Sequence, residues 1–248
     1  MKMQHRLYYI ISLFMFLMWS TASFSQEETK IDTLALKENY GLRLGGDASK
    51  LIRSFVDKDY KGFEVNGDYR LTKKIYIAGE LGIEERNIIT DYLNTTTSGS
   101  YFKAGIDINL YKNWLDMENM IYSGFRVGVS SFSHTLNSYT VYNTDQYWND
   151  PYTQTQSREF NGLSAIWAEL IIGIKTEVLN NVYVGLNAQL KGMVSQDEPT
   201  NFENLYVPGF NKTYDSGRFG VGFGYSVSYL IPIYKKDKKV KTEESISD

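Results

Sequence analysis

Four carboxylates, Glu80, Glu84, Asp107 and Glu169, have the residue type for general acid–base catalysis or for a proton path. Two carboxylates held close together can divide the roles of acid and base, because their pKa values separate. All four, however, stand in segments of alternating apolar and polar residues, and across all such segments of the chain the polar positions together carry as many lysines and arginines as acids. The sequence therefore favours structural ion pairs at these positions and predicts no catalytic residue.

A single histidine, His134, stands outside the N-terminal leader. With Ser133 beside it and an acid elsewhere, it could form the Ser/His/acid set of a lipid-modifying outer-membrane hydrolase. Neighbouring residues of a strand point to opposite faces, so this serine and this histidine are poorly placed for one another. A surface-loop histidine is the favoured interpretation, and the hydrolase using His134 stays an alternative. One histidine also provides no histidine-rich metal site, and neither a metal nor a cofactor is predicted.

The stretch YTVYNTDQYWNDPY, residues 139–152, is dense in aromatic and polar side chains. Exposed tyrosine and tryptophan favour contacts with proteins or sugars, because they bury a large area and still offer a hydrogen bond. A loop that folds over the mouth of its own barrel is an equally good interpretation. The predicted contact residues are Tyr139, Tyr142, Tyr147, Trp148 and Tyr152.

Strands must position these side chains, because alternation runs through most of the chain. In YFKAGIDINLY, residues 101–111, one face is apolar and the other carries Lys103 and Asp107, which is the pattern of a two-faced strand. Eight such segments occur, at Tyr40–Ala48, Gly62–Leu71, Ile75–Glu84, Tyr101–Tyr111, Ile121–Ser130, Ala165–Lys175, Val182–Gly192 and Arg218–Ile233. Short and long connections alternate between them, and the long ones include 131–164 and 193–217. The sequence predicts an all-β fold, an eight-stranded antiparallel transmembrane β-barrel with short periplasmic turns and longer outward loops.

The two faces of these segments differ sharply in charge. The polar face collects seven bases and seven acids, and the opposite face carries no charge. The fourteen charged residues are Arg43, Asp47, Glu64, Asp68, Arg70, Glu80, Glu84, Lys103, Asp107, Arg126, Glu169, Lys175, Lys191 and Arg218. If the apolar face meets lipid, these residues form an ion-pair network in the lumen; if it lies inside, the chain is a soluble periplasmic barrel that binds an apolar ligand.

Two compositional features favour lipid on the apolar face. Glycines gather on the charged face, where small residues would fill a narrow lumen between long side chains. Aromatic residues fall near the ends of the segments, as in the girdles of membrane barrels. The expected girdle residues are Tyr40, Tyr69, Tyr76, Tyr101, Tyr111, Trp114, Tyr122, Tyr183, Tyr229 and Tyr234.

The ends of the chain differ from the alternating part. Residues 1–25 have a basic start, a short apolar run and small residues, which predicts a signal peptide. Residues 26–39 are predicted to be a flexible lead-in, 40–234 the outer-membrane barrel, and 235–248 a charged periplasmic tail. The absence of cysteine excludes a cysteine-linked lipid anchor and disulfides, and a net charge of -3 argues against nucleic acid as a partner.

Four motifs carry a resemblance to a known family: YGLRLGGDASKLIRSF, RLTKKIYIAGELGIEE, YFKAGIDINLY and GFRVGVSSFSHTL. Over residues 40–234 the chain resembles an uncharacterised Bacteroidota family of outer-membrane β-barrels, a domain-of-unknown-function family. The resemblance implies a barrel in the outer membrane of a Gram-negative bacterium. It brings no catalytic residues with it.

The sequence predicts a non-enzymatic outer-membrane barrel that acts as a structural or accessory subunit. Its expected partners are outer-membrane lipid and other envelope proteins, and an assembly or secretion complex is a specific case. The alternatives are the hydrolase using His134, the soluble barrel with an apolar ligand, and a small channel. We expect no conductance, because a balanced set of acids and bases in a narrow lumen should fill it.

Overall fold

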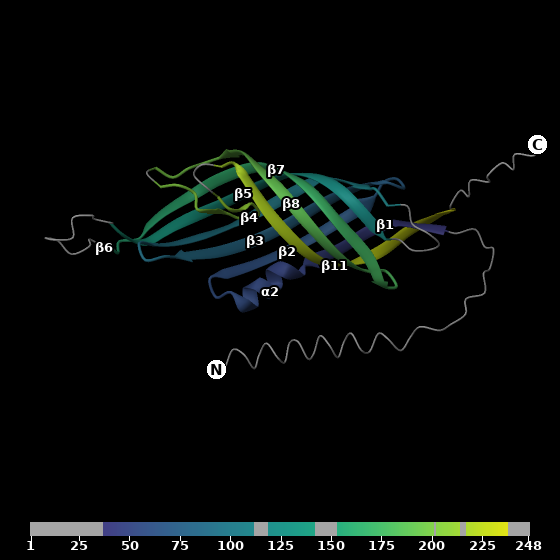
Figure 1. The fold of residues 1–248 in the computed structure, drawn as a ribbon, viewed down its shortest axis with the longest axis horizontal. Helices are drawn as coiled ribbons and strands as arrows, with labels where there is room; N and C mark the ends of the chain where they lie inside the picture. The colour runs from purple at the N-terminus through teal and green to yellow at the C-terminus, as the bar shows by residue number, and fades with distance from the viewer. Residues whose placement is uncertain (1–36, 112–118, 142–152, 201, 214–216, 238–248) are drawn as a thin grey trace, which may run out of the picture. The chain divides into compact units, whose positions relative to one another are not determined.

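The computed structural model describes residues 37–111, 119–141, 153–200, 202–213 and 217–237 (Figure 1). Eight long strands form one antiparallel ring, in which each strand pairs with its neighbours along the chain and the first pairs with the last. They are β1 (Lys37–Asp47), β2 (Tyr60–Arg70), β3 (Ile75–Ile89), β4 (Leu93–Asn109), β5 (Met120–Thr140), β7 (Arg158–Leu179), β8 (Val182–Gln196) and β11 (Phe219–Asp237). The predicted eight-stranded barrel is confirmed. The predicted leader at 1–25 and most of the tail lie outside the described residues.

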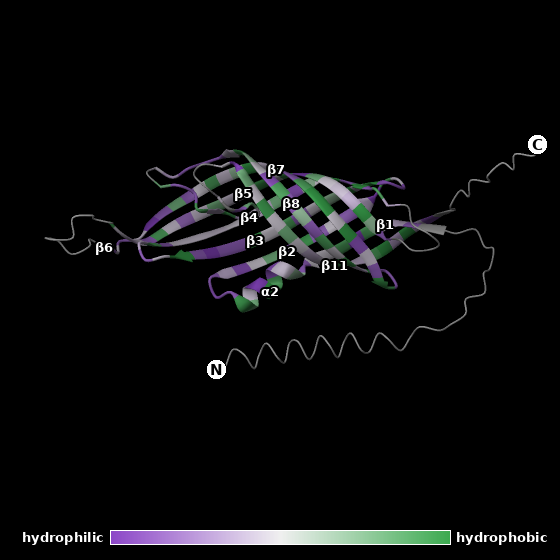
Figure 2. Ribbon diagram, in the orientation of Figure 1, coloured by the Kyte–Doolittle hydropathy of each residue, from purple (hydrophilic) through white to green (hydrophobic). Residues whose placement is uncertain are grey.

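The charged face of the barrel is the inner one. Lys103 and Asp107 are 1% and 0% exposed, whereas Ile106 and Ile108 between and beside them are 44% and 41% exposed. Figure 2 shows the same alternation of hydrophobic and hydrophilic residues along the other strands. An uncharged apolar outer wall suits lipid, and closure of the ring pairs the first strand with the last. The barrel is therefore of the transmembrane type, and a soluble barrel with an apolar ligand inside does not agree with this orientation.

Several strands are longer than a membrane requires. β4, β5 and β7 have 17, 21 and 22 residues, whereas about 9–11 tilted residues cross a bilayer. The additional length is rich in serine and threonine and pairs strand to strand, for example at Ser98 with Ser133. The long connection expected at 131–164 is therefore mostly strand. This extension was not predicted from the sequence, because serine and threonine occupy positions at which apolar residues were required.

One helix, α2 (Ala48–Val56), joins β1 to β2 and was not predicted. Asp47 caps its start, because the carboxylate accepts a hydrogen bond from the backbone N–H of Ser49 at 2.7 Å. The helix is amphipathic, and its apolar residues Leu51, Ile52 and Phe55 are exposed. Figure 1 places it along the barrel wall beside β2 and β11. Among the described residues, no helix is long and apolar enough to cross a membrane.

The tyrosines differ from the expected interfacial girdle. Five of them are buried on the lumen side: Tyr40, Tyr76, Tyr101, Tyr122 and Tyr183. Three of the ten expected residues are exposed, Tyr111, Tyr229 and Tyr234, and Trp114 lies outside the described residues. All five buried rings lie under cations, and all but Tyr40, which precedes a register shift in β1, share the parity of the charged residues. The guanidinium of Arg43, for example, stands 5.0 Å from the ring of Tyr76.

Candidate functional site

A continuous chain of ion pairs begins on β1 and runs through the lumen. Arg43 and Lys175 both contact Asp68 at 2.7 Å. Lys175 also lies 3.7 Å from Asp107, which in turn pairs with Arg126 at 2.7 Å. The pairs join β1, β2, β7, β4 and β5, so they link opposite walls of the ring. Each carboxylate is shared between two bases, as expected where charges are enclosed away from water.

The chain of ion pairs continues from Arg126 towards the loop end of the barrel. Arg126 lies 3.7 Å from Glu80, and Lys103 donates to Glu80 at 2.8 Å. Lys103 also stands 3.7 Å from Glu169, which lies 3.5 Å from Lys191. Lys103 is almost completely buried, so burial and three carboxylate neighbours fix it in place. These charges fill the centre of the barrel.

Glu84 is the branching point at the loop end of the network. Its carboxylate accepts hydrogen bonds from Lys50, from the Tyr60 hydroxyl at 3.0 Å and from the Tyr206 hydroxyl at 2.7 Å. It also accepts the backbone N–H of Gly209 at 2.9 Å. One buried carboxylate therefore holds α2, β2 and the connection between β8 and β11 together.

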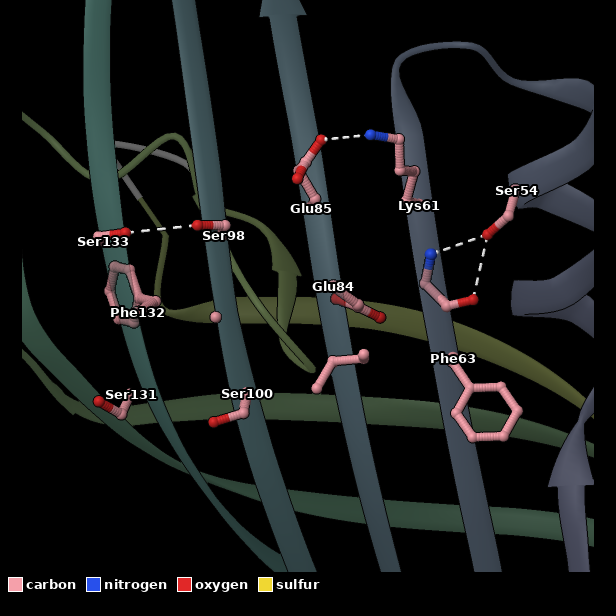
Figure 3. Close-up of a pocket in the computed structure, with 13 residues that line it drawn as sticks. Ser54, Lys61, Phe63, Glu84, Glu85, Ser98, Ser100, Ser131, Phe132 and Ser133 are labelled. Atoms are coloured by element: carbon pink, nitrogen blue, oxygen red, sulfur yellow. Dashed lines mark hydrogen bonds and ion pairs between the residues drawn. The ribbon is translucent and has the colours of Figure 1, made fainter.

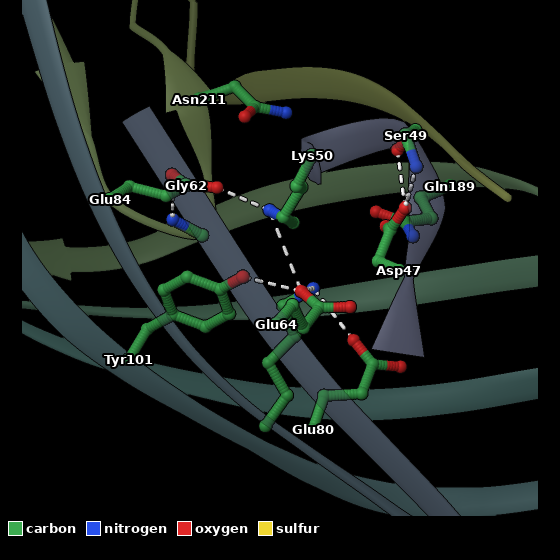
Figure 4. A network of polar contacts seen from close by, with 12 residues as sticks. Asp47, Ser49, Lys50, Gly62, Glu64, Glu80, Glu84, Tyr101, Gln189 and Asn211 are labelled. Atoms are coloured by element: carbon green, nitrogen blue, oxygen red, sulfur yellow. Dashed lines mark hydrogen bonds and ion pairs between the residues drawn. The ribbon is translucent and has the colours of Figure 1, made fainter. Parts of the chain in front are cut away.

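Lys50 links the helix to the network and was missed in the sequence. Its ammonium group pairs with Glu84 and lies 3.5 Å from Glu64 (Figure 4). Its position three residues after Asp47, the N-cap of the helix, could have indicated that Lys50 lies in the first turn of a helix at the barrel wall. With it, the network has six bases and six acids: Arg43, Lys50, Lys103, Arg126, Lys175 and Lys191 with Glu64, Asp68, Glu80, Glu84, Asp107 and Glu169.

The structure brings eleven of the fourteen predicted lumen residues into this network. The other three behave differently. Asp47 caps α2. Arg70 lies at the opposite end, where its guanidinium stacks over Tyr40 at 4.5 Å and donates to the carbonyl of Asn39. The expectation for Arg218 is wrong, since it is exposed in a bend and the strand begins one residue later.

The connection between β8 and β11 folds back into the barrel mouth. Its segment YVPGF, residues 206–210, is buried throughout and includes the short strand β9 (Tyr206–Val207), which pairs with β10 (Asn211–Lys212). The ring of Phe210 meets the fully buried Trp167 edge to face, with centroids 6.1 Å apart. Lys191 donates to the carbonyl oxygen of Gly209 at 2.7 Å. This inward segment, which we call the plug, was expected to be an outward loop.

Replacing Gly209 with alanine should displace the plug. Its φ of +81° favours glycine, and an added Cβ would stand 2.6 Å from the Tyr101 ring. We expect Gly209→Ala to make the segment cleavable by protease in folded protein, as judged by mass spectrometry of the fragments. The matched control is Gly217→Ala, because a Cβ there meets no atom within 4 Å. Equal resistance of the two variants to protease would contradict the proposed role of Gly209.

His134 is a buried structural residue on β5. Its Nδ1 accepts from the hydroxyl of Thr97 at 2.6 Å, and its Nε2 donates to the side-chain oxygen of Asn204 at 2.9 Å. Ser133 points to the outer wall, where its hydroxyl lies 3.4 Å from that of Ser98. Within the described part of the chain, no serine or carboxylate is hydrogen-bonded to the ring. The expected surface loop is wrong here, because β5 continues to Thr140.

A family model covers nearly the whole chain. The model for "Domain of unknown function (DUF6048)" matches residues 6–236. The chain belongs to the DUF6048 family. The expected domain-of-unknown-function family is thereby shown, and the Bacteroidota source stays a prediction.

Outside the DUF6048 family, the chain is similar to other proteins in fold rather than in sequence. No curated protein matches the chain in sequence. Among solved structures, it is similar to Ail, the attachment invasion locus protein of Yersinia pestis, with a TM-score of 0.40 and 10% sequence identity. The match covers 77% of this chain and 97% of Ail. So distant a likeness carries no statement about activity.

The other candidate binding surfaces of this DUF6048 chain lie on the outer wall and the loops. A shallow depression of about 830 Å³ crosses β2 to β5 where the apolar wall gives way to serines (Figure 3). Ser54 of α2 lines it together with four serines of β4 and β5, Ser98, Ser100, Ser131 and Ser133. Of the predicted contact residues, Tyr139 is half-buried within β5, and Tyr142, Tyr147, Trp148 and Tyr152 lie outside the described residues. The described residues form no cluster of three metal-ligating side chains.

Proposed function

We propose that this protein is a non-enzymatic barrel of the Gram-negative outer membrane that serves as a structural or accessory subunit. The observation that carries the proposal is the filled lumen. Six acids and six bases neutralise one another along the centre, and the plug closes the mouth above them. A barrel without a free lumen works through its outer surface, its loops and its ends.

The filled lumen argues against the alternative of a small channel. An eight-stranded barrel is only wide enough for its own side chains, and here they are paired across the ring. Moving an ion through would require several buried pairs to separate at once, each at a cost of several kcal/mol. The environment of His134 likewise gives no support to a lipid-modifying hydrolase, since its two ring nitrogens bond to Thr97 and Asn204.

The partners that fit this role are other envelope proteins, bound through the outward loops and the charged tail. Four of the five predicted aromatic contact residues lie in the connection between β5 and β7, and Tyr139 lies near the end of β5. An assembly or secretion complex of the outer membrane is the specific case that we favour. No nucleic-acid partner is expected, since the net charge is -3.

Affinity purification from native membranes tests the proposal. We expect the protein to fractionate with the outer membrane and to copurify with envelope proteins after crosslinking in intact cells. Deleting residues 142–152 should reduce the yield of those proteins without reducing the amount of folded barrel. Ion conductance in planar bilayers should be absent. Open-channel currents, or recovery of the barrel alone from crosslinked cells, would overturn the proposal.

A further inference from the structure

The ring of strands has a lateral gap at its loop end. β1 stops pairing with β11 at Asp47 and with β2 at Gly46. Beyond these points, Phe219–Tyr225 of β11 pairs only with β8, and Tyr60–Glu64 of β2 pairs only with β3. The chain that would have continued β1 forms α2 instead. The wall is therefore interrupted between β2 and β11, and the helix stands in the interruption.

The helix closes the β2 side of the gap. The hydroxyl of Ser54 accepts the backbone N–H of Gly62 at 2.8 Å, and its one proton is shared between the carbonyls of Lys50 at 2.8 Å and Gly62 at 3.1 Å (Figure 3). An unpaired strand edge is costly in lipid, and this side chain substitutes for the missing strand. Lys50 fastens the same helix to Glu84 inside the barrel. Among the described residues, no hydrogen bond joins α2 to β11.

The β11 side of the gap remains open as a cleft of about 400 Å³. Its inner end reaches the lumen residues Lys103 and Lys191, and its outer end is lined by Val221 and Phe223 on the exterior of β11. Arg53 of α2 stands at the rim. Two carboxylates also line the cleft, but Asp47 caps α2 and Glu64 faces Lys50. The cleft thus joins an apolar outer wall to polar groups that include the guanidinium of Arg53, and a lipid molecule has the same division between an apolar chain and a polar head.

The outer surfaces on both sides of the cleft are apolar. Ile52, Phe55 and Val56 on α2 are exposed, with Phe55 at 89%. On β11, Val221 and Phe223 are exposed in the same way and continue the lipid-facing wall of the barrel. An exposed apolar face of this kind is typical of a surface that contacts a membrane or another protein. Its continuity with the transmembrane wall indicates that lipid is the cover.

Arg53, at the rim of the cleft, has N–H donors that are available to a ligand. Within the described structure, Arg53 has a single ion pair, to Asp57 at 3.5 Å, and stacks over the ring of Tyr60 at 4.0 Å. A guanidinium has five N–H donors and binds phosphate with two of them at once. The deeper bases are already committed to carboxylates of the network. An anionic head would therefore meet Arg53 first.

We propose that the cleft between α2 and β11 binds one phosphate-bearing membrane lipid. Arg53 contacts the phosphate, and an acyl chain runs over Val221 and Phe223 of β11. The apolar face of α2 lies in the same leaflet as that chain. This site goes beyond the proposed accessory role and does not depend on it.

Lipid selectivity tests the site directly. The full-length protein is placed in nanodiscs with equal amounts of phosphatidylglycerol and phosphatidylcholine, and native mass spectrometry counts the lipids that stay bound after release. We expect phosphatidylglycerol to be retained about three- to fivefold over phosphatidylcholine, the size of one modest ion pair. Arg53→Gln should abolish the preference, and Arg53→Lys should keep part of it.

The matched control is Lys61→Gln, which removes an equal charge from an exposed side chain of β2, outside the cleft. It should leave the preference unchanged. Equal retention of the two lipids by the unchanged protein would overturn the proposal, and so would an equal loss in both glutamine variants.

The position of the helix is a second, independent measurement. The chain has no cysteine, so single nitroxide labels can be attached at Phe55→Cys and, as the aqueous control, at Lys58→Cys. We expect the label at 55 to collide with oxygen and to be shielded from an aqueous nickel chelate, and the label at 58 to show the reverse. Nickel access at 55 would overturn the proposal. So would shielding of 55 from both quenchers in native membranes, since that outcome indicates a protein partner on this face.

Discussion

Replacing Glu84 with alanine is expected to lower the free energy of unfolding of the barrel by about 3–5 kcal/mol, the cost of breaking a buried ion pair. The substitution leaves the ammonium of Lys50 with only the more distant Glu64 and removes the acceptor of two tyrosine hydroxyls and of one backbone N–H. Urea unfolding of the protein in detergent micelles, followed by near-UV circular dichroism, measures this change.

The neighbouring Glu85→Ala provides the matched control for Glu84→Ala. Glu85 has the same side chain but points outward, where it pairs with the exposed Lys61 at 3.0 Å. Exposed pairs contribute about 0–1 kcal/mol, so this variant should unfold almost as the unchanged protein does. Similar losses in the two variants would show that Glu84 is not the branching point described above. Glu84→Gln should fall between them, because an amide oxygen still accepts a hydrogen bond but carries no charge.

Placing an arginine on the outer wall should be the second large perturbation. On β5 the outward residues run from Ile121 to Val129, and Phe125 stands midway between them. An arginine at the bilayer midplane costs about 2–4 kcal/mol, so Phe125→Arg should destabilise the folded barrel by that amount. Folding into phospholipid vesicles, judged by the heat-dependent shift of the folded band on gels, should also be slower.

Ser131→Arg is the control for the outer wall, because it lies on the same strand and face, beyond the apolar band. Its cost should be about 0–1 kcal/mol, as near the interface. If the two arginines proved equally tolerable, the apolar wall would not be in contact with acyl chains. The membrane orientation of the barrel would then have to be abandoned.

The ring and its orientation could be predicted from the sequence because they rest on a strict period of two. In residues 101–111 that period separates Lys103 and Asp107 from every apolar neighbour, and eight repeats of the pattern leave few alternatives to a barrel. The parity of the charges also identified most of the lumen network. Arg218 was misplaced because parity was extended one residue beyond the start of its strand.

The plug could not be predicted, because its inward path depends on partners remote in sequence. Gly209 meets Glu84, which precedes it by 125 residues, and no local pattern announces such a contact. The expected girdle was wrong for a different reason. The tyrosines were assigned by their nearness to strand ends, although the parity of Tyr76, Tyr101, Tyr122 and Tyr183 places them on the charged, inner face. The helix α2 could have been predicted from the sequence, because Asp47 is a suitable N-cap and Leu51, Ile52 and Phe55 have helical spacing. It was missed because the segments on both sides alternate as strands do.

The ion-pair network of the lumen has a consequence for how the chain inserts into the bilayer. Its partners come from strands far apart in sequence, as Lys175 and Asp68 are 107 residues apart. A sheet inserted before its first and last strands meet would present uncompensated charge to hydrocarbon, at a cost that rises with each orphaned group. We therefore expect the barrel to close as it inserts. A partly closed barrel should not insert stably into the bilayer.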